Sequence, residues 1–184
     1  MEKSWYRKLV SRLQRPGSTS TQAKADDGDA DAQFALGLRC GSRPGEARDF
    51  AQAAHWYRKA ADQNHPLAQF NLGIMYAKGQ GLPQDDAEAV VWIRRAAAQG
   101  DAGAYFHLGM RSYRASVSGL PKDVNESRVE AYKWFHLAAA EGYKDSDAAC
   151  ERVTLTMSGD EVAEGNHRAA AFVSGKSTSF VAAP

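Results

Sequence analysis

The chain has 184 residues, of which 43% are hydrophobic and 24% are charged, and its formal net charge is +1. This composition argues against a chain that is disordered throughout, and the balanced charge gives no global electrostatic basis for binding nucleic acid. The sequence contains no run of about 18 apolar residues, so it predicts no transmembrane helix.

Residues 1–15 are predicted to form a basic amphipathic helix. Five basic residues against one acidic residue give this segment a net charge of +4, and its apolar residues have the spacing of one helix face. Three roles stay open: fraying or packing on its own domain, docking, or removal as an organelle transit peptide. Docking on a membrane surface or on a partner would use Trp5, Tyr6, Leu9 and Leu13.

Residues 16–27 are small, polar and turn-prone, so they are predicted to form a flexible linker. The N-terminal region lacks the apolar stretch of a secretory signal. We therefore expect a cytoplasmic protein, which would be peripheral at the membrane if residues 1–15 dock there.

A repeat of 36 residues follows the linker. The segments DAQFALGL, LAQFNLGI and GAYFHLGM begin at residues 31, 67 and 103, and a second block that contains Trp56, Trp92 and Trp134 recurs behind them. The last interval between tryptophans is 42 residues, so the third copy carries six extra residues. The predicted units are repeat 1 at 28–64, repeat 2 at 65–100 and repeat 3 at 101–144.

Each unit is predicted to be a pair of antiparallel helices. A glycine recurs at positions 37, 73 and 109, and it favours a close approach of two helices because it carries no side chain. Asn64 and Gly100 fit left-handed helix ends, and Asp85 with Glu88 has the spacing of a capping box. One such pair buries too little apolar surface by itself, so the pairs are expected to stack.

The chain after the third repeat resembles a repeat that has lost its pattern. Residues 145–173 are predicted to form a degenerate C-terminal capping pair, whose second helix opens at a capping box of Ser158 and Glu161. Residues 174–184 are predicted to be a flexible tail. The six extra residues of repeat 3 are expected to enlarge a loop at residues 116–127, which is a candidate binding element.

The recurring blocks AxxFxLGxxY, GxGLPxD and AxxWxxxAAxxG resemble the Sel1-like repeat (SLR) family, which is related to the tetratricopeptide repeats. The resemblance covers about residues 29–142, and the second unit fits best. The first unit departs from the pattern because Cys40 replaces the tyrosine, and the third has Ser112 there. The resemblance implies an all-α fold, a right-handed α/α superhelical solenoid of helix-turn-helix repeats.

The resemblance also implies a non-catalytic scaffold or adaptor for protein–protein interaction. By analogy with tetratricopeptide repeats, a partner peptide or helix would bind the concave face, where the first helices of the repeats lie side by side. Packing between repeats is the alternative role for the same recurring side chains. The candidates for this face are Phe34, Leu38, Phe70, Ile74, Phe106 and Met110.

No catalytic, metal-binding or cofactor-binding motif stands out. The sequence contains no HExxH, GxSxG or phosphate-loop pattern, and Cys40 and Cys150 are far apart. A cysteine-rich branch of the family, linked to β-lactam hydrolysis, has paired cysteines in each repeat, which this chain lacks. We therefore expect no enzyme, no cofactor and no metal, with another protein as partner. Basic residues on the second helices are expected to form a solvated face, with an anion-binding strip as the alternative.

Overall fold

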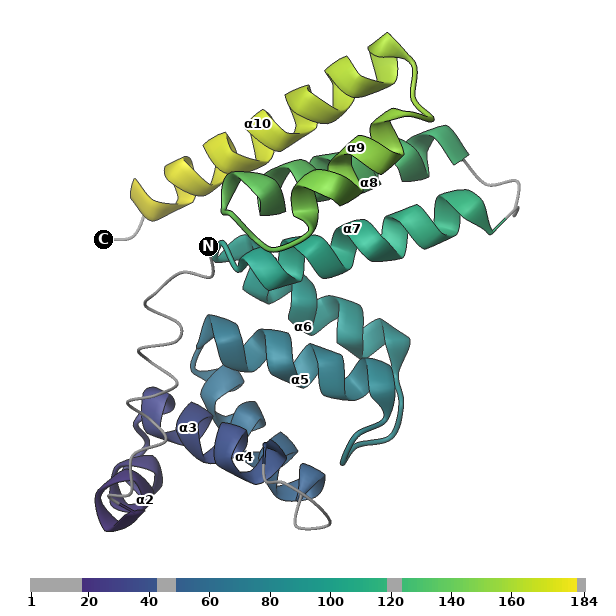
Figure 1. Cartoon of the computed structure of the whole chain (residues 1–184). Coiled ribbons are helices and arrows are strands. Elements are labelled where there is room, and N and C mark those ends of the chain that lie inside the picture. The colour runs from purple at the N-terminus through teal and green to yellow at the C-terminus, as the bar shows by residue number, and fades with distance from the viewer. Residues whose placement is uncertain (1–17, 43–48, 119–123, 182–184) are drawn as a thin grey trace. The chain divides into compact units, whose positions relative to one another are not determined.

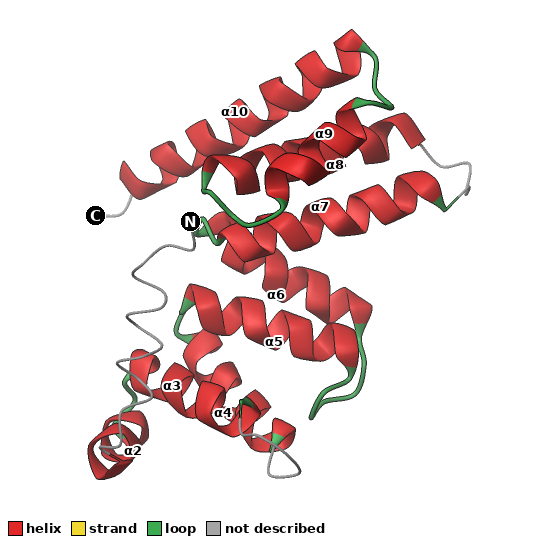
Figure 2. Ribbon diagram, viewed as in Figure 1, coloured by secondary structure: helices red, strands yellow, loops and turns green. Residues whose placement is uncertain are grey.

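The computed structural model describes residues 18–42, 49–118 and 124–181. This part of the chain consists of helices joined by short turns, without a β-strand (Figure 2). Helices α2 to α6 belong to one compact unit, and helices α7 to α10 belong to a second. The prediction of an all-α chain is therefore confirmed over the described residues.

The N-terminal unit contains two helical hairpins, preceded by one short helix (Figure 1). Its helices are α2 (Ser18–Asp26), α3 (Ala30–Gly41), α4 (Phe50–Asp62), α5 (Pro66–Lys78) and α6 (Asp86–Ala98). Alanines on α4 and α5 let the helices approach, and larger side chains fill the remaining space. The core contains Phe34, Ala53, Ala54, Tyr57, Ala60, Ala61, Ala68, Leu72 and Trp92.

The C-terminal unit contains the third hairpin and a following helix pair. Its helices are α7 (Ala102–Val117), α8 (Val124–Ala140), α9 (Ser146–Thr154) and α10 (Gly159–Val181). The core here is formed by Ala131, Tyr132, Phe135 and Val153. Both α9 and α10 pack against α8, so the last two helices cover the third hairpin.

The recurring glycine permits close helix contact in all three hairpins. A Cβ atom built on Gly37 would lie 2.6 Å from the Tyr57 ring, and one on Gly109 would lie 2.6 Å from the Phe135 ring. At Gly73 it would lie 2.6 Å from Ile93 Cγ1 and 3.0 Å from the Ala89 carbonyl oxygen. The predicted close approach is confirmed, because no real Cβ fits at these distances.

Helix ends follow the predicted chemistry. Asn64 and Gly100 have φ values of 64° and 94°. Asp85 accepts hydrogen bonds from the N–H groups of Ala87 and Glu88, while the Glu88 carboxylate accepts from Trp92 Nε1 at 3.1 Å instead of reaching back to the cap. The α10 capping box is complete: Ser158 N donates to Glu161 Oε2 and Glu161 N donates to Ser158 Oγ, at 2.7 and 3.2 Å.

The segment predicted to be a linker, residues 16–27, is mostly helical, because α2 occupies Ser18–Asp26. Ala25 is buried against Ala32 and Leu36, and Gln33 Nε2 donates a hydrogen bond to the Ala25 carbonyl at 3.0 Å. In the next repeat Gln69 Nε2 donates to the Ala61 carbonyl at 3.2 Å, also between buried groups. Helix α2 therefore covers α3 as the second helix of a preceding repeat would, and this burial orders it.

Two further expectations differ from the structure. Helix α10 continues to Val181, so most of the predicted tail at 174–184 is helical, and α10 contains no proline that would interrupt it. The extra residues of repeat 3 lengthen helices: α7 has 16 residues and α8 has 17, against 13 in α5 and in α6. The expected loop at 116–127 is reduced to the connection between α7 and α8, since contacts with α10 hold the first turn of α8.

Candidate functional site

Side chains of α3 and α5 form the first candidate surface. Phe70 and Ile74 are both half-buried and lie four residues apart, so they project from the same side of α5. Leu38 on α3 is half-buried and packs against the core of the N-terminal unit. We call these three residues the helix-A face. They retain accessible apolar surface, which a partner needs in order to bind there.

Phe34 is not part of this surface. Its side chain is 1% exposed, and its ring stacks on His65 with a centroid distance of 4.6 Å. The ring of Tyr57 lies 5.8 Å away on the other helix of the same hairpin. Phe34 therefore packs one repeat against the next, and a partner cannot reach it.

Phe106 and Met110 are half-buried in the C-terminal unit. The ring of Phe106 lies 5.6 Å from Phe135 and 5.2 Å from Tyr143, and both Phe106 and Met110 pack against the core of this unit. Cys150 on α9 joins the same packing. Much of the apolar surface of these two candidates is thus used within the unit.

The docking candidates Trp5, Tyr6, Leu9 and Leu13 lie outside the described residues. Within the ranges that the structure describes, no helix combines the length and the apolar character needed to cross a bilayer. In the same ranges, no three His, Cys, Asp or Glu side chains come together as a metal site.

His65 joins α3 to α5 and is the most buried histidine near the helix-A face. Its Nδ1 accepts a hydrogen bond from Ala68 N at 3.2 Å and so caps α5, and its Nε2 lies 3.2 Å from Asp31 Oδ1. Because Nδ1 accepts, the neutral ring carries its proton on Nε2. Burial lowers the pKa of His65, although the Asp31 carboxylate acts in the opposite direction.

We expect His65 to make the stability of the N-terminal unit depend on pH. The lowered pKa means that the unfolded chain binds this proton more readily, so the stabilisation is complete above pH 6.5 and falls as the pH drops through the folded-state value. A helix cap contributes about 1 kcal/mol, so we expect the pH-dependent loss of stability to be of about this size. His65→Asn keeps a cap without a titrating group, so the variant should lose less stability between pH 7.5 and pH 5 in chemical unfolding. Equal pH dependence of the two proteins would contradict this role.

Arginine and aromatic side chains pack together on the N-terminal unit. The Arg58 guanidinium lies 5.3 Å from the centroid of the Tyr76 ring and 5.5 Å from that of Trp92, and it donates a hydrogen bond to the Tyr76 hydroxyl. Arg95 lies 4.5 Å from the Trp92 centroid. These contacts join α4, α5 and α6 through cation–π attraction. The Arg58 side chain therefore packs against aromatic rings, whereas the sequence predicted a solvated face for the basic residues of the second helices.

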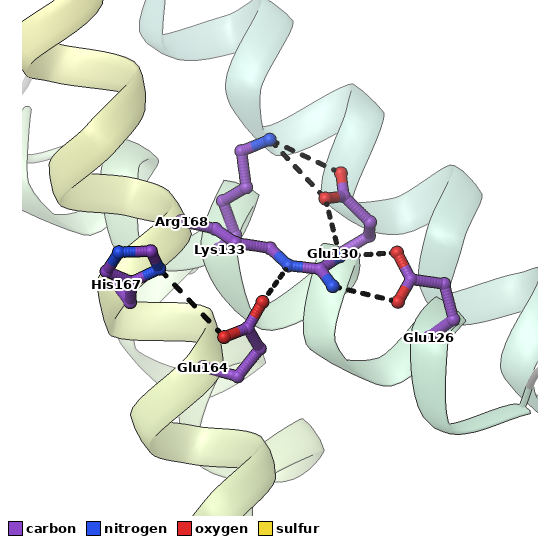
Figure 3. Close-up of polar contacts among 6 residues, drawn as sticks. All are labelled: Glu126, Glu130, Lys133, Glu164, His167 and Arg168. Atoms are coloured by element: carbon purple, nitrogen blue, oxygen red, sulfur yellow. Dashed lines mark hydrogen bonds and ion pairs between the residues drawn. The ribbon is translucent and has the colours of Figure 1, made fainter.

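A charged network links α8 to α10 in the C-terminal unit (Figure 3). Arg168 donates to both carboxylate oxygens of Glu126 and to Glu130 at 3.3 Å, and its Nε donates to Glu164 at 2.7 Å. Lys133 Nζ lies 3.4 Å from Glu130 Oε1. Hydrogen bonds from Arg168 lower the pKa of Glu126, and those to Glu126 and Glu164 raise the pKa of Arg168.

Sequence reasoning missed two sets of residues. Gln33 and Gln69 are buried, and each accepts a hydrogen bond from a glutamine 30 residues later, Gln63 at 2.8 Å and Gln99 at 2.7 Å. Their spacing of 36 residues was a visible signal. The network around Arg168 left no comparable signal, because α10 carries no clear copy of the repeat pattern.

Comparison with protein families finds three Sel1 repeats, at residues 30–65, 66–101 and 102–143. The chain is similar to a protective antigen of uropathogenic Escherichia coli with an SLR fold, with a TM-score of 0.75 and 25% identity over 90% of this chain. It covers 36% of that antigen, so it spans just over a third of its length. A Sel1 repeat protein from Oxalobacter formigenes matches with a TM-score of 0.59 and 34% identity, covering 70% of this chain and 92% of the other. A search of curated proteins gives no match.

These matches bear out the resemblance to the SLR family and the fold class predicted from the sequence, a solenoid of helix-turn-helix repeats. Sel1 repeat proteins generally serve as scaffolds for interactions between proteins. Since the three matched repeats cover more than half of the sequence, the chain belongs to the Sel1 repeat family.

Proposed function

We propose that this chain is a non-catalytic interaction scaffold, an adaptor that binds a peptide or a helix of another protein on the helix-A face. The observation that carries the proposal is the position of Phe70 and Ile74 on successive turns of α5, with apolar surface left accessible. An amphipathic helix or an extended peptide can cover two such side chains at once.

The burial pattern supports this location. At the equivalent positions of the other hairpins, Phe34 is fully buried and Phe106 packs on two aromatic rings. The face is therefore assigned to Leu38, Phe70 and Ile74. His65 caps the start of α5 and Gly79 closes its end, so Phe70 and Ile74 lie on a regular helix, which lowers the entropy lost when a partner binds.

Substitutions on α5 should weaken partner binding more than they lower stability. Ile74→Glu places a charge in the middle of the face, and Phe70→Ala removes its largest side chain. We expect either change to reduce affinity by about thirtyfold or more, which corresponds to the roughly 2 kcal/mol of a binding hot spot. The measurement is capture of partners from native lysate, followed by titration of the recovered partner and by thermal melting of each variant.

Val91→Glu is the matched control, because Val91 is 45% exposed on α6 and lies outside the face. This variant should capture the partner as the unchanged protein does. Equal losses for Ile74→Glu and Val91→Glu, or a large fall in melting temperature with unchanged affinity of the folded protein, would contradict the proposal.

A further inference from the structure

The helix-A face has carboxylates at one end. Residues 26–31 contain four exposed aspartates and no basic residue, and we call these four aspartates the acidic rim. The Asp31 carboxylate lies 3.2 Å from His65 Nε2, directly before α5, so the rim lies where α3 and α5 begin. Asp31 and Leu38 are seven residues apart, which is two helical turns, so both project from the same side of α3.

The other end of the helix-A face carries the opposite charge. Lys78 is exposed in the last turn of α5, four residues after Ile74 and therefore on the same side of the helix. Arg39 is exposed in the last turn of α3. The face is thus an apolar strip with carboxylates at its start and cations at its end. A helix that complements it has an apolar side, cations at one end and an anion at the other.

The first fifteen residues of the chain have this chemistry. They lie outside the described residues, and their sequence predicts a basic amphipathic helix. Arg12 and Arg15 lie at the end of this segment that leads into α2, whereas its one acidic residue, Glu2, lies at the opposite end. The predicted apolar side contains Trp5, Tyr6, Leu9 and Leu13.

The attachment to α2 keeps this segment near the acidic rim. Two residues separate position 15 from α2, and α2 ends at Asp26, which belongs to the rim. The nine residues of α2 span about 13 Å and the connection adds at most about 10 Å, so position 15 stays within about 25 Å of the rim. A helix of fifteen residues is about 22 Å long, which is close to the length of about 20 Å for α5.

This attachment and the opposite charges favour contact within one chain. A short tether gives the segment a local concentration in the millimolar range, so even a weak contact with the face is populated. The segment has a net charge of +4, and the rim contains four carboxylates. Their attraction is screened by salt, because the rim is exposed. With Arg12 and Arg15 at the rim, Glu2 comes to the end of the face that carries Lys78.

We propose that residues 1–15 cover the helix-A face of their own chain and compete there with the partner. The apolar side of the segment contacts Leu38, Phe70 and Ile74, its last two arginines pair with the acidic rim, and Glu2 faces Lys78. The competition rests on the function proposed for the helix-A face, and it makes access to that face regulated. A partner binds there by displacing residues 1–15.

The contact is tested in the purified full chain, with no partner present. A photoreactive phenylalanine analogue replaces Ile74, and mass spectrometry locates the adducts after irradiation. We expect an adduct between position 74 and residues 1–15 of the same chain. The same analogue at position 91 on α6, outside the face, should give no adduct with this segment.

Two variants with the same change of charge test the direction of the segment. Leu9→Glu alters its predicted apolar side, whereas Ser11→Glu alters the opposite side of the predicted helix. Leu9→Glu should weaken the contact by about tenfold or more, the effect of one leucine side chain returned to water, and the adduct yield should fall. Ser11→Glu should retain the adduct, and 0.5 M salt should lower its yield relative to 0.05 M salt.

Partner binding tests the competition. A partner recovered from native lysate should bind Leu9→Glu more tightly than Ser11→Glu, since the open face is then more populated. Equal affinities, the absence of adducts with residues 1–15, or equal adduct yields for the two variants would overturn the proposal. An adduct that joins two chains would overturn the assignment to one chain. A retained adduct without capture of any partner would instead contradict the function proposed for the face, while the contact itself would stand.

Discussion

Phe34→Ala is expected to destabilise the N-terminal unit by about 3–5 kcal/mol, the range for a large aromatic side chain removed from a core. Phe34 is 1% exposed and fills the space between Tyr57 and His65, so its loss leaves a cavity that the rigid hairpins close poorly. Chemical unfolding followed by circular dichroism gives the free energy directly.

Phe70→Ala is the matched control, because Phe70 is the residue of the next repeat at the same position. Its side chain is half-buried, so we expect a smaller loss, of about 1–2 kcal/mol. Equal losses of stability for the two variants would show that this position plays the same role in both repeats. The difference in burial between Phe34 and Phe70 predicts unequal losses.

Gly73→Ala should destabilise the same unit by about 1–3 kcal/mol, even though alanine is the better helix former. The new Cβ would lie 3.0 Å from the Ala89 carbonyl oxygen and 3.2 Å from Ile93 N. These are backbone atoms, so the two helices must move apart for the methyl group to fit. The fall in melting temperature should be about 2–4 °C for each kcal/mol, as for chains of this size.

Gly175→Ala provides a control of opposite sign. Gly175 lies inside α10, and a Cβ there would meet nothing within 4 Å. This substitution should leave stability unchanged or raise it by up to about 1 kcal/mol, the gain in helix propensity. A stabilising Gly73→Ala would contradict close contact between α5 and α6.

The repeat itself was predictable because its packing has a sequence period. Glycines at one position in each copy predicted the helix contacts at Gly37, Gly73 and Gly109. The left-handed positions at Asn64 and Gly100 also followed from residue type alone, since few residues adopt that backbone conformation at low cost. These features are local or recur, and both kinds can be read without coordinates.

The differences arise where burial depends on distant neighbours. Helix α2 has a polar sequence that resembles a linker, yet Ala25 is buried because α2 packs against Ala32 and Leu36 of α3. The match of Ala25 with Ala61, 36 residues later, was a weak signal of this role. For Phe34 the recurring pattern could not distinguish a contact between repeats from a binding face. Either role would place a phenylalanine at the same position of each repeat.

The ion pairs that join α10 to α8 could not be predicted from the sequence, because they also depend on distant neighbours. Glu126 and Arg168 are 42 residues apart, and they meet only because α10 packs against α8. Exposed and half-exposed charges occur on every helix that the structure describes, so composition does not identify which of them meet.

Site-specific photo-crosslinking tests the central claim, that partners bind on the helix-A face. A photoreactive phenylalanine analogue is placed at position 74 on α5 or at position 91 on α6, and each protein is irradiated in native lysate. We expect a covalent adduct with a partner protein from position 74 and none from position 91. Adducts from position 91 alone, or none from position 74 while the unmodified protein still captures its partner, would contradict it.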